Sequence, residues 1–541
     1  MATLDIDYRK FDKMSPFEIK DGLIRLAKSS AQKSANTLLN AGRGNPNWVA
    51  TKPREAFFLF GSFALSECRR SMDDPVAGLA GMPQMKGISE RFELWLHQHE
   101  DQPGAEFLRK MVDYATMRLG FDADAFVHEL TDSIIGDNYP VPDRMLVHAE
   151  QIAHRYLMWA MCNDKPPGGR FDLYAVEGGT AAMCYIFKSL MANRILKKGD
   201  RIALGTPIFT PYVEIAHLED YAFDVVNIRA LQENRFQYSD EEIRKLEDPS
   251  IKAFFVVNPG NPTSMAIDPA TMAKLVEFVK TKRPDLIILT DDVYGTFVPN
   301  FRSLMAELPY NTIGVYSYSK YFGCTGWRLG VIAVHERNII DDRIAKLGER
   351  ERQALHDRYI AITLEPENLK FIDRIVADSR DVALNHTAGL SLPQQVMMTM
   401  FSLAELMDTD KVYQKACMKI CEDRLASLLM GLPLDLQPNQ NFAYYYGTID
   451  FEFWLRRVAG EEMVEWLKEH IHPLDLVRRL AEDHAIVLLN GGGFAAPDWS
   501  TRVSFANLPD DVYDDIGRAV RAVGRGYIEA YNASKASTTR K

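Results

Sequence analysis

A lysine lies in an almost uncharged stretch of the sequence, SYSKYFGCTGWRLG, which runs from Ser317 to Gly330. Lys320 has aromatic and small neighbours there, with a hydroxyl at Ser317 and a guanidinium at Arg328. Apolar surroundings lower the pKa of an amine, and a neutral amine can form a Schiff base with a carbonyl compound. The hydroxyl and the guanidinium suit a phosphate group. An isolated pattern of this kind is more often a surface lysine beside a loop arginine, so other signals must decide.

A glycine pair follows the predicted strand FDLYAVE and opens a predicted helix. Gly178 and Gly179 allow the backbone to approach an anion, and the first turn of a helix offers free N–H groups and a positive dipole end. Thr180 adds a hydroxyl. A strand–glycine–helix turn is more often purely structural, so this segment is a candidate anion site only when other signals point to the same ligand.

Two more polar segments come after apolar strands. NPGNPT (258–263) contains two Asn-Pro steps, which make a rigid turn that can aim the Asn261 amide at an oxygen or form a plain Asx turn. LIILTDDVY places Asp291 and Asp292 at the end of a very apolar strand, with Tyr294 close behind. A buried carboxylate is unfavourable unless it meets a cation or a donor, so we expect one of the two acids to point inward.

These segments together match the requirements of pyridoxal 5′-phosphate (PLP). Its ring nitrogen needs an acid, its aldehyde a lysine, its phenolic oxygen donors and its phosphate an anchor. The ends of strands in an open α/β sheet are where such ligands bind. The six cysteines and twelve histidines show no metal-ligand spacing, so no metal is expected.

The order of GGT, NPGNPT, DDVY, SYSKYFGCTGWRLG and, far downstream, RVSFA resembles the fold-type I aminotransferase superfamily and its aspartate aminotransferase branch. The resemblance covers roughly 135–365 and 385–510. It implies an α/β fold with a large mixed or parallel-sheet domain, a smaller α+β domain and an extra helical insertion. The division that we predict is an N-terminal segment (1–53), a helical insertion (54–134), a PLP-binding domain (135–395) and a C-terminal domain (396–541).

The resemblance also implies roles for the residues that contact the cofactor. Lys320 would carry it covalently, and the others would hold its ring nitrogen (Asp291), its phenolic oxygen (Asn261, Tyr294), its ring face (Phe209) and its phosphate (Gly179, Thr180, Ser317, Arg328).

Two further residues are placed by the resemblance at the substrate and at the subunit boundary. Arg502 would bind the substrate α-carboxylate. Tyr139, in NYPVP, would reach the phosphate of the neighbouring subunit's cofactor and is counted with Lys320 as catalytic. Active sites would then be shared across a dimer.

The chain has 541 residues and is much longer than ordinary members of this branch. With NAGRGNPNW near its start and NGGGFAAPDW near its end, it resembles the bacterial aspartate 4-decarboxylases. This implies conversion of L-aspartate to L-alanine and CO2, with side aminotransferase activity in which a 2-oxo acid such as pyruvate restores the cofactor. The alternative is an aspartate or aromatic amino acid aminotransferase without significant decarboxylase activity.

The partner of the departing β-carboxylate is the open point of this hypothesis. Another subgroup of the family has a lysine at the position of Thr180, and this chain lacks it. Arg43, in NAGRGNPNW, is the candidate, and it is otherwise a loop arginine paired to an acid. Arg380 is a weaker candidate.

The composition of the chain limits the kinds of partner that we expect it to bind. The net charge of −11 is spread along the chain, so nucleic-acid binding is not expected, and the acidic character of 54–134 argues against a DNA-binding regulator built on this fold. No apolar run reaches the ~20 residues of a membrane span. The polar N-terminus and scattered cysteines indicate a cytoplasmic protein.

The apolar residues of 54–134 predict packing against a neighbour and a homo-oligomer built from dimers, with a dodecamer as the candidate size. The tail NASKASTTRK is expected to be disordered.

Overall fold

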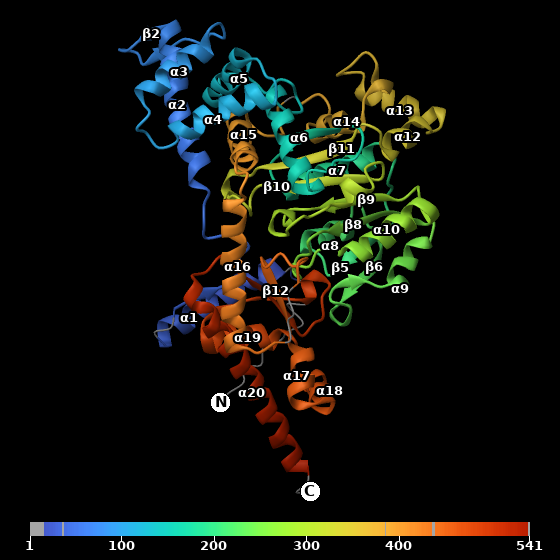
Figure 1. Cartoon of the computed structure of the whole chain (residues 1–541). Helices are drawn as coiled ribbons and strands as arrows, with labels where there is room; N and C mark the ends of the chain where they lie inside the picture. Colours follow the sequence, from blue (N-terminus) through green and yellow to red (C-terminus); the bar gives the residue numbers. More distant parts are fainter. Residues whose placement is uncertain (1–13, 15, 35–36, 385, 435–438, 539–541) are drawn as a thin grey trace.

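A computed structural model of the chain, which describes residues 14, 16–34, 37–384, 386–434 and 439–538, has an eight-stranded mixed sheet at its centre (Figure 1). The order is β4-β11-β10-β9-β8-β5-β6-β7. The run from β10 to β6 is parallel, whereas β11 is antiparallel to both of its neighbours and β7 is antiparallel to β6. The strands are β4 (Phe171–Val176), β5 (Arg201–Thr206), β6 (Asp224–Leu231), β7 (Gln237–Tyr238), β8 (Ile251–Val257), β9 (Ile287–Asp291), β10 (Thr312–Ser317) and β11 (Gly330–His335).

The central strands read as continuous apolar runs because helices cover both faces of the sheet. Every residue of β4, β9, β10 and β11 is buried. The α/β fold with a mixed sheet is therefore confirmed. The covering helices are α6 (Val147–Cys162), α7 (Gly179–Ala192), α8 (Thr210–His217), α9 (Asp240–Arg244), α10 (Pro269–Lys282), α11 (Leu304–Glu307), α12 (Ile339–Ala345), α13 (Glu349–Tyr359) and α14 (Phe371–Ser379).

Residues 51–135, ahead of the sheet in the chain, form a mainly helical block at one end of the molecule (Figure 1). It contains α2 (Thr51–Ser71), α3 (Ile88–Gln98), α4 (Ala105–Asp113), the π-helix η2 (Tyr114–Arg118), α5 (Ala123–Ile135) and a hairpin of β2 (Asp73–Asp74) with β3 (Leu79–Ala80). Phe60, Phe63 and Phe92 form its aromatic centre, with ring centroids 4.6–5.8 Å apart. Helices α2 and α5 also pack on α15 (Leu392–Met407). The domain boundaries given above stay a prediction.

Both ends of the described chain build the remaining part. Helix α1 (Pro16–Ser34) packs on α19 (Leu474–His484), and β1 (Leu39–Asn40) pairs in parallel with β13 (Ile486–Val487). A second sheet has the order β12-β15-β14. Its strands and the other helices here are β12 (Tyr446–Asp450), β14 (Leu489–Asn490), β15 (Ser500–Ser504), α16 (Val412–Gly431), α17 (Phe451–Ala459), α18 (Glu461–His470) and α20 (Tyr513–Thr538).

The expectation of a disordered tail was wrong for its described residues. Helix α20 continues to Thr538, and Tyr531 and Lys535 on it both bond the Glu462 carboxylate of α18. These contacts tie down a polar segment whose composition suggested disorder. No helix in the described ranges is long and apolar enough to cross a bilayer.

Candidate active site

A cavity of about 220 Å³ lies at the carboxyl ends of β8, β9 and β10. It brings together ten of the residues predicted to bind cofactor or substrate: Gly179, Thr180, Phe209, Asn261, Asp291, Tyr294, Ser317, Lys320, Arg328 and Arg502. The sheet explains this convergence, because parallel strands end at the same edge. In the register, Val257 of β8 and Val315 of β10 both pair with Asp291 of β9.

Asp291 is a buried acid without a cation of its own. The Tyr212 hydroxyl donates to its Oδ2 at 3.3 Å, and the backbone N–H of Val293 lies 3.4 Å from its Oδ1. Within the described ranges no lysine, arginine or histidine forms an ion pair with it. Burial raises the pKa of this carboxyl to about 6. Asp292, in contrast, accepts hydrogen bonds from the hydroxyls of Thr290 and Ser303, so Asp291 is the acid that faces the cavity.

Lys320 lies in the turn that follows β10. Its Nζ donates to the carbonyl oxygen of Gly44 at 3.1 Å. Burial lowers the pKa of this amine, and the positive charges of Arg502 and Arg328 act in the same direction against the opposing effects of Tyr446 and Asp291. The structure therefore favours the neutral, nucleophilic form that an imine-forming lysine needs.

The start of helix α7 and Arg328 form an anion cradle. Gly178 has φ +87°, and a Cβ added there would lie 2.7 Å from Nη2 of Arg328. No side chain caps α7, so the N–H groups of its first turn stay available to a ligand. Arg328 is held in place by bonds to the carbonyl oxygens of Glu177 and Thr325, at 3.1 and 3.2 Å. Ser317 lines the cavity beside them.

Arg502, on β15, brings a buried guanidinium to the cavity wall. It donates from Nη1 to Oδ1 of Asn261 at 2.9 Å and from Nη2 to the carbonyl oxygen of Gly42 at 2.8 Å. Its Nε has no partner in the described part of the chain. The guanidinium carbon lies 4.2 Å from the centre of the Tyr446 ring. A buried cation with an orphaned N–H group suits a carboxylate ligand.

Several residues of the cavity were missed by sequence reasoning. Gly44 and Tyr446 come from opposite ends of the chain, and the Tyr294 hydroxyl donates to that of Tyr446 at 3.0 Å. Tyr446 lies in FAYYYGTIDF, whose aromatic residues suit a strand, but three successive tyrosines do not reveal which one faces a ligand. Ser319, Thr325 and, behind Asp291, Tyr212 carried no signal of their own.

Three predicted candidates do not line this cavity. Arg43 is exposed, although its neighbour Gly44 is part of the wall. Tyr139 is exposed and stacks on the ring of His386 at 4.6 Å. Arg380 is buried elsewhere and donates to the carbonyl oxygens of Asp143 and Ala388. Arg43 and Tyr139 therefore stay predictions that depend on other contacts.

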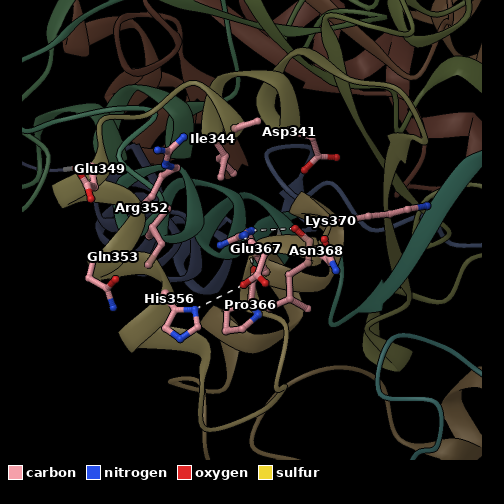
Figure 2. A pocket seen from close by; sticks show the side chains of 14 residues that line it. Asp341, Ile344, Glu349, Arg352, Gln353, His356, Pro366, Glu367, Asn368 and Lys370 are labelled. Atoms are coloured by element: carbon pink, nitrogen blue, oxygen red, sulfur yellow. Dashed lines mark hydrogen bonds and ion pairs between the residues drawn. The ribbon is translucent and has the colours of Figure 1, made fainter.

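A second cavity, of about 460 Å³, lies between α12, α13 and the start of α14 (Figure 2). Its charged side chains are largely engaged with one another or with the backbone. Lys370 bonds Asp172 at 2.8 Å, His356 lies 3.5 Å from Glu367, and Arg374 donates to carbonyl oxygens. None of the predicted site residues lines it. The smaller cavity is therefore the candidate active site.

The comparisons with known proteins decide the family. The sequence model of the class I and II aminotransferases matches residues 176–520. The chain belongs to this family. It is 47% identical over 527 residues to a Pseudomonas protein named bifunctional aspartate aminotransferase and L-aspartate beta-decarboxylase, covering 97% of this chain and 99% of the relative.

Solved structures confirm the fold of this aminotransferase. The Thermus thermophilus aspartate aminotransferase with maleate has a TM-score of 0.55 at 16% identity, covering 97% of this chain and 100% of that one. The N-succinyldiaminopimelate aminotransferase of Mycobacterium tuberculosis has a TM-score of 0.57 at 15% identity, covering 97% and 99%.

The aminotransferase is PLP-dependent, as its family is. The cavity fits this cofactor. It offers a carboxylate that lacks a cation (Asp291), an amine whose pKa is lowered by burial (Lys320) and an uncapped helix N-terminus beside a guanidinium (Arg328).

Substituting Lys320 should remove the covalent attachment of the cofactor, because this is the amine that we predict to form the bond. We expect the absorbance band of the bound cofactor near the visible edge to be lost in Lys320→Ala. After borohydride treatment, mass spectrometry should find the cofactor fixed to the parent protein and to the control Lys370→Ala, whose lysine lines the other cavity. Cofactor fixed to Lys320→Ala would contradict the assignment.

The raised pKa of Asp291 predicts a pH-dependent stability of the cofactor-free protein. Between pH ~4 and 6 the folded state keeps a proton that the unfolded chain, with a carboxyl pKa of ~3.9, releases. This contribution to stability is present at low pH and is lost as the pH rises through about 6. The shift corresponds to about 3 kcal/mol.

Asp291→Asn cannot ionise and should escape this loss. We expect its free energy of unfolding, measured relative to the parent by urea titration, to rise between pH 4 and 7. Asp220→Asn, at an exposed position, serves as the control and should show no such trend. A difference between Asp291→Asn and the parent that does not change with pH would refute the prediction.

Proposed function

We propose that this chain catalyses the PLP-dependent β-decarboxylation of L-aspartate to L-alanine and CO2, with a side aspartate aminotransferase activity. One observation carries the proposal. The relative named for both activities matches 97% of the chain, whereas the aspartate aminotransferase of Sulfurisphaera tokodaii matches 27% of it. The likeness to the bifunctional protein therefore extends well beyond the segment shared with a simple aminotransferase.

Bound PLP supplies an electron sink, which stabilises the negative charge that develops when a bond of the substrate is broken. Asp291 would hold the ring nitrogen, where its carboxylate would favour the protonated form. The first turn of α7, with Thr180, Ser317 and Arg328, binds the phosphate. Asn261 would donate to the phenolic oxygen, as would Tyr294 once its hydroxyl turns from Tyr446 to the cofactor, and Phe209 would lie against the ring.

Lys320 is the group that moves protons. In its free form, its Nζ would take the proton from the substrate Cα and later return one to that carbon. The carbonyl oxygen of Gly44, 3.1 Å from Nζ, orients the amine by accepting a hydrogen bond. Release of the amino acid product requires the neutral amine again, and burial in the cavity favours that form.

Arg502 orients the substrate through its α-carboxylate, because its guanidinium is fixed on two sides and carries a free N–H group. The β-carboxylate that leaves as CO2 must not be held by a strong bidentate partner. Arg43 is its proposed contact, on the segment that includes Gly44. Where an oxo acid departs before CO2 is lost, a 2-oxo acid such as pyruvate restores the cofactor, which accounts for the aminotransferase activity.

The protein is also proposed to be a homo-oligomer built from dimers, in which Tyr139 reaches the partner's cofactor site. Apolar side chains exposed on the helical block provide a surface for a further copy of the chain, up to a dodecamer: Phe58, Leu65, Val76, Leu79, Leu94 and Met117. Of the six free cysteines, five are buried thiols, which agrees with a reducing cytoplasm.

Incubation with L-aspartate and no 2-oxo acid tests the function. We expect sustained release of CO2 and alanine, because β-decarboxylation regenerates the original form of the cofactor. An aminotransferase without decarboxylase activity would stop after one stoichiometric turnover.

Arg502→Lys keeps the charge but loses the planar donor arrangement, so its KM for aspartate should rise roughly 10-fold or more.

Sedimentation velocity tests the assembly. The parent should sediment as a species larger than a dimer. The double variant Phe58→Asp and Leu94→Asp should shift it toward dimers, since it places charges on the exposed apolar surface of the block. Val412→Asp, which alters an exposed apolar residue outside the block, should leave the assembly unchanged. A parent protein that sediments as a simple dimer would exclude the larger assembly.

A further inference from the structure

The turn that carries Lys320 is fastened to the segment that leads into the helical block. We call residues 318–323 the lysine turn. The indole N–H of Trp48 donates to the carbonyl oxygen of Tyr321 at 3.2 Å, and the backbone N–H of Ala50 donates to that of Phe322 at 3.3 Å. Together with the bond from Lys320 to Gly44, these contacts join the turn to residues 44–50.

Arg54, in the first turn of α2, makes the strongest of these contacts. Its Nη1 lies 3.1 Å from the carbonyl oxygen of Phe322, and its Nη2 lies 2.8 Å from that of Gly323. Nη1 also donates to the carbonyl oxygen of Ala50 at 2.6 Å. Charge-assisted bonds of this kind are roughly twice as strong as neutral ones.

The guanidinium of Arg54 is devoted to these carbonyl groups. It forms no ion pair with any acid in the described ranges of the chain, and its carbon lies 5.1 Å from the centre of the Phe401 ring. A cation without a carboxylate partner that binds successive carbonyls stabilises the carbonyl end of a turn, as a basic side chain does at a helix C-terminus. Arg54 is therefore placed to stabilise the carbonyl groups at the end of the lysine turn.

Close packing leaves the lysine turn little room to relax. Gly323 has φ +58°, and a Cβ added there would lie 1.9 Å from the carbonyl oxygen of Trp48. The turn is also held through Tyr321, whose hydroxyl donates to the buried carboxylate of Glu405 at 2.8 Å. The Tyr413 hydroxyl donates to the carbonyl oxygen of Tyr321 at 2.9 Å. Arg54 thus completes a clamp on a short turn.

We propose that Arg54 is a positioning residue for the reaction, which holds the lysine turn so that Nζ of Lys320 keeps its place in the cavity. The inference rests on the proposed function, and it gives the helical block a part in catalysis through the first turn of α2. Loss of the guanidinium leaves the carbonyl oxygen of Gly323 without its donor and weakens the hold on that of Phe322. A small displacement of a catalytic group costs rate rather than substrate affinity.

Three variants separate positioning from folding. Arg54→Gln removes the charge and the paired donors. Arg54→Lys keeps the charge but cannot bond two carbonyls in the fork geometry of arginine. Arg91→Gln is the matched control, because Arg91 lies in the same block and binds the buried Glu67 at 2.7 Å without contacting the lysine turn.

Two readouts are needed. In the holoenzyme, Arg54→Gln should lower kcat for aspartate roughly 10- to 100-fold with KM nearly unchanged, and Arg54→Lys should fall between it and the parent. In the cofactor-free protein, hydrogen–deuterium exchange of the peptide covering 317–325 should be faster in Arg54→Gln. Arg91→Gln should leave both quantities at the parental values.

The outcomes are distinct. Parental kcat and exchange in Arg54→Gln would overturn the proposal, as would equal changes in Arg91→Gln, since these would report a general loosening of the block. If the parent lacked activity toward aspartate, the proposed function would fail, whereas faster exchange in Arg54→Gln alone would still support the clamp on the lysine turn.

Discussion

The burial of two ionisable groups in one cavity is the constraint on which the rest of this structure depends. Asp291 is shielded from water and forms no ion pair in the described chain. Lys320 is also shielded from water, and its amine donates a hydrogen bond to a carbonyl oxygen. Each group by itself destabilises the folded protein. A ligand that brings a protonated nitrogen to the acid and an aldehyde to the amine removes both penalties. The surrounding strands and helices keep these groups dry and correctly spaced.

Much of the fold and of the cofactor site could be predicted from the sequence because the signals were local. Seven of the eight strands of the main sheet were visible as apolar runs, whereas the two-residue strand β7 was too short to show any pattern. Glycines, prolines and acids at the ends of these runs marked the residues that converge at the sheet edge. The parallel arrangement of the strands, which no motif encodes, brings segments more than a hundred residues apart in the chain to one place.

The remaining walls of the site could not be found in this way. Gly44 and Tyr446 join the cavity through the docking of the part built from both chain ends, and no local pattern encodes that docking. Arg54 was hidden for a related reason. Its partners are backbone carbonyls, which every residue possesses. The sequence around Phe322 and Gly323 therefore gives no indication that an arginine about 270 positions away binds them. The helical end of the chain was missed because its anchor, Glu462, lies on another helix.

The wall formed by β12 and β15 has a consequence for the order in which the protein matures. During synthesis on the ribosome, Lys320 and Asp291 emerge well before Tyr446 and Arg502, which come from strands close to the end of the chain. The residues that we predict to bind the cofactor are therefore all synthesised before Arg502, which we predict to bind the substrate. Under the proposed function, we expect the substrate side of the cavity to be completed only when β12 and β15 join it.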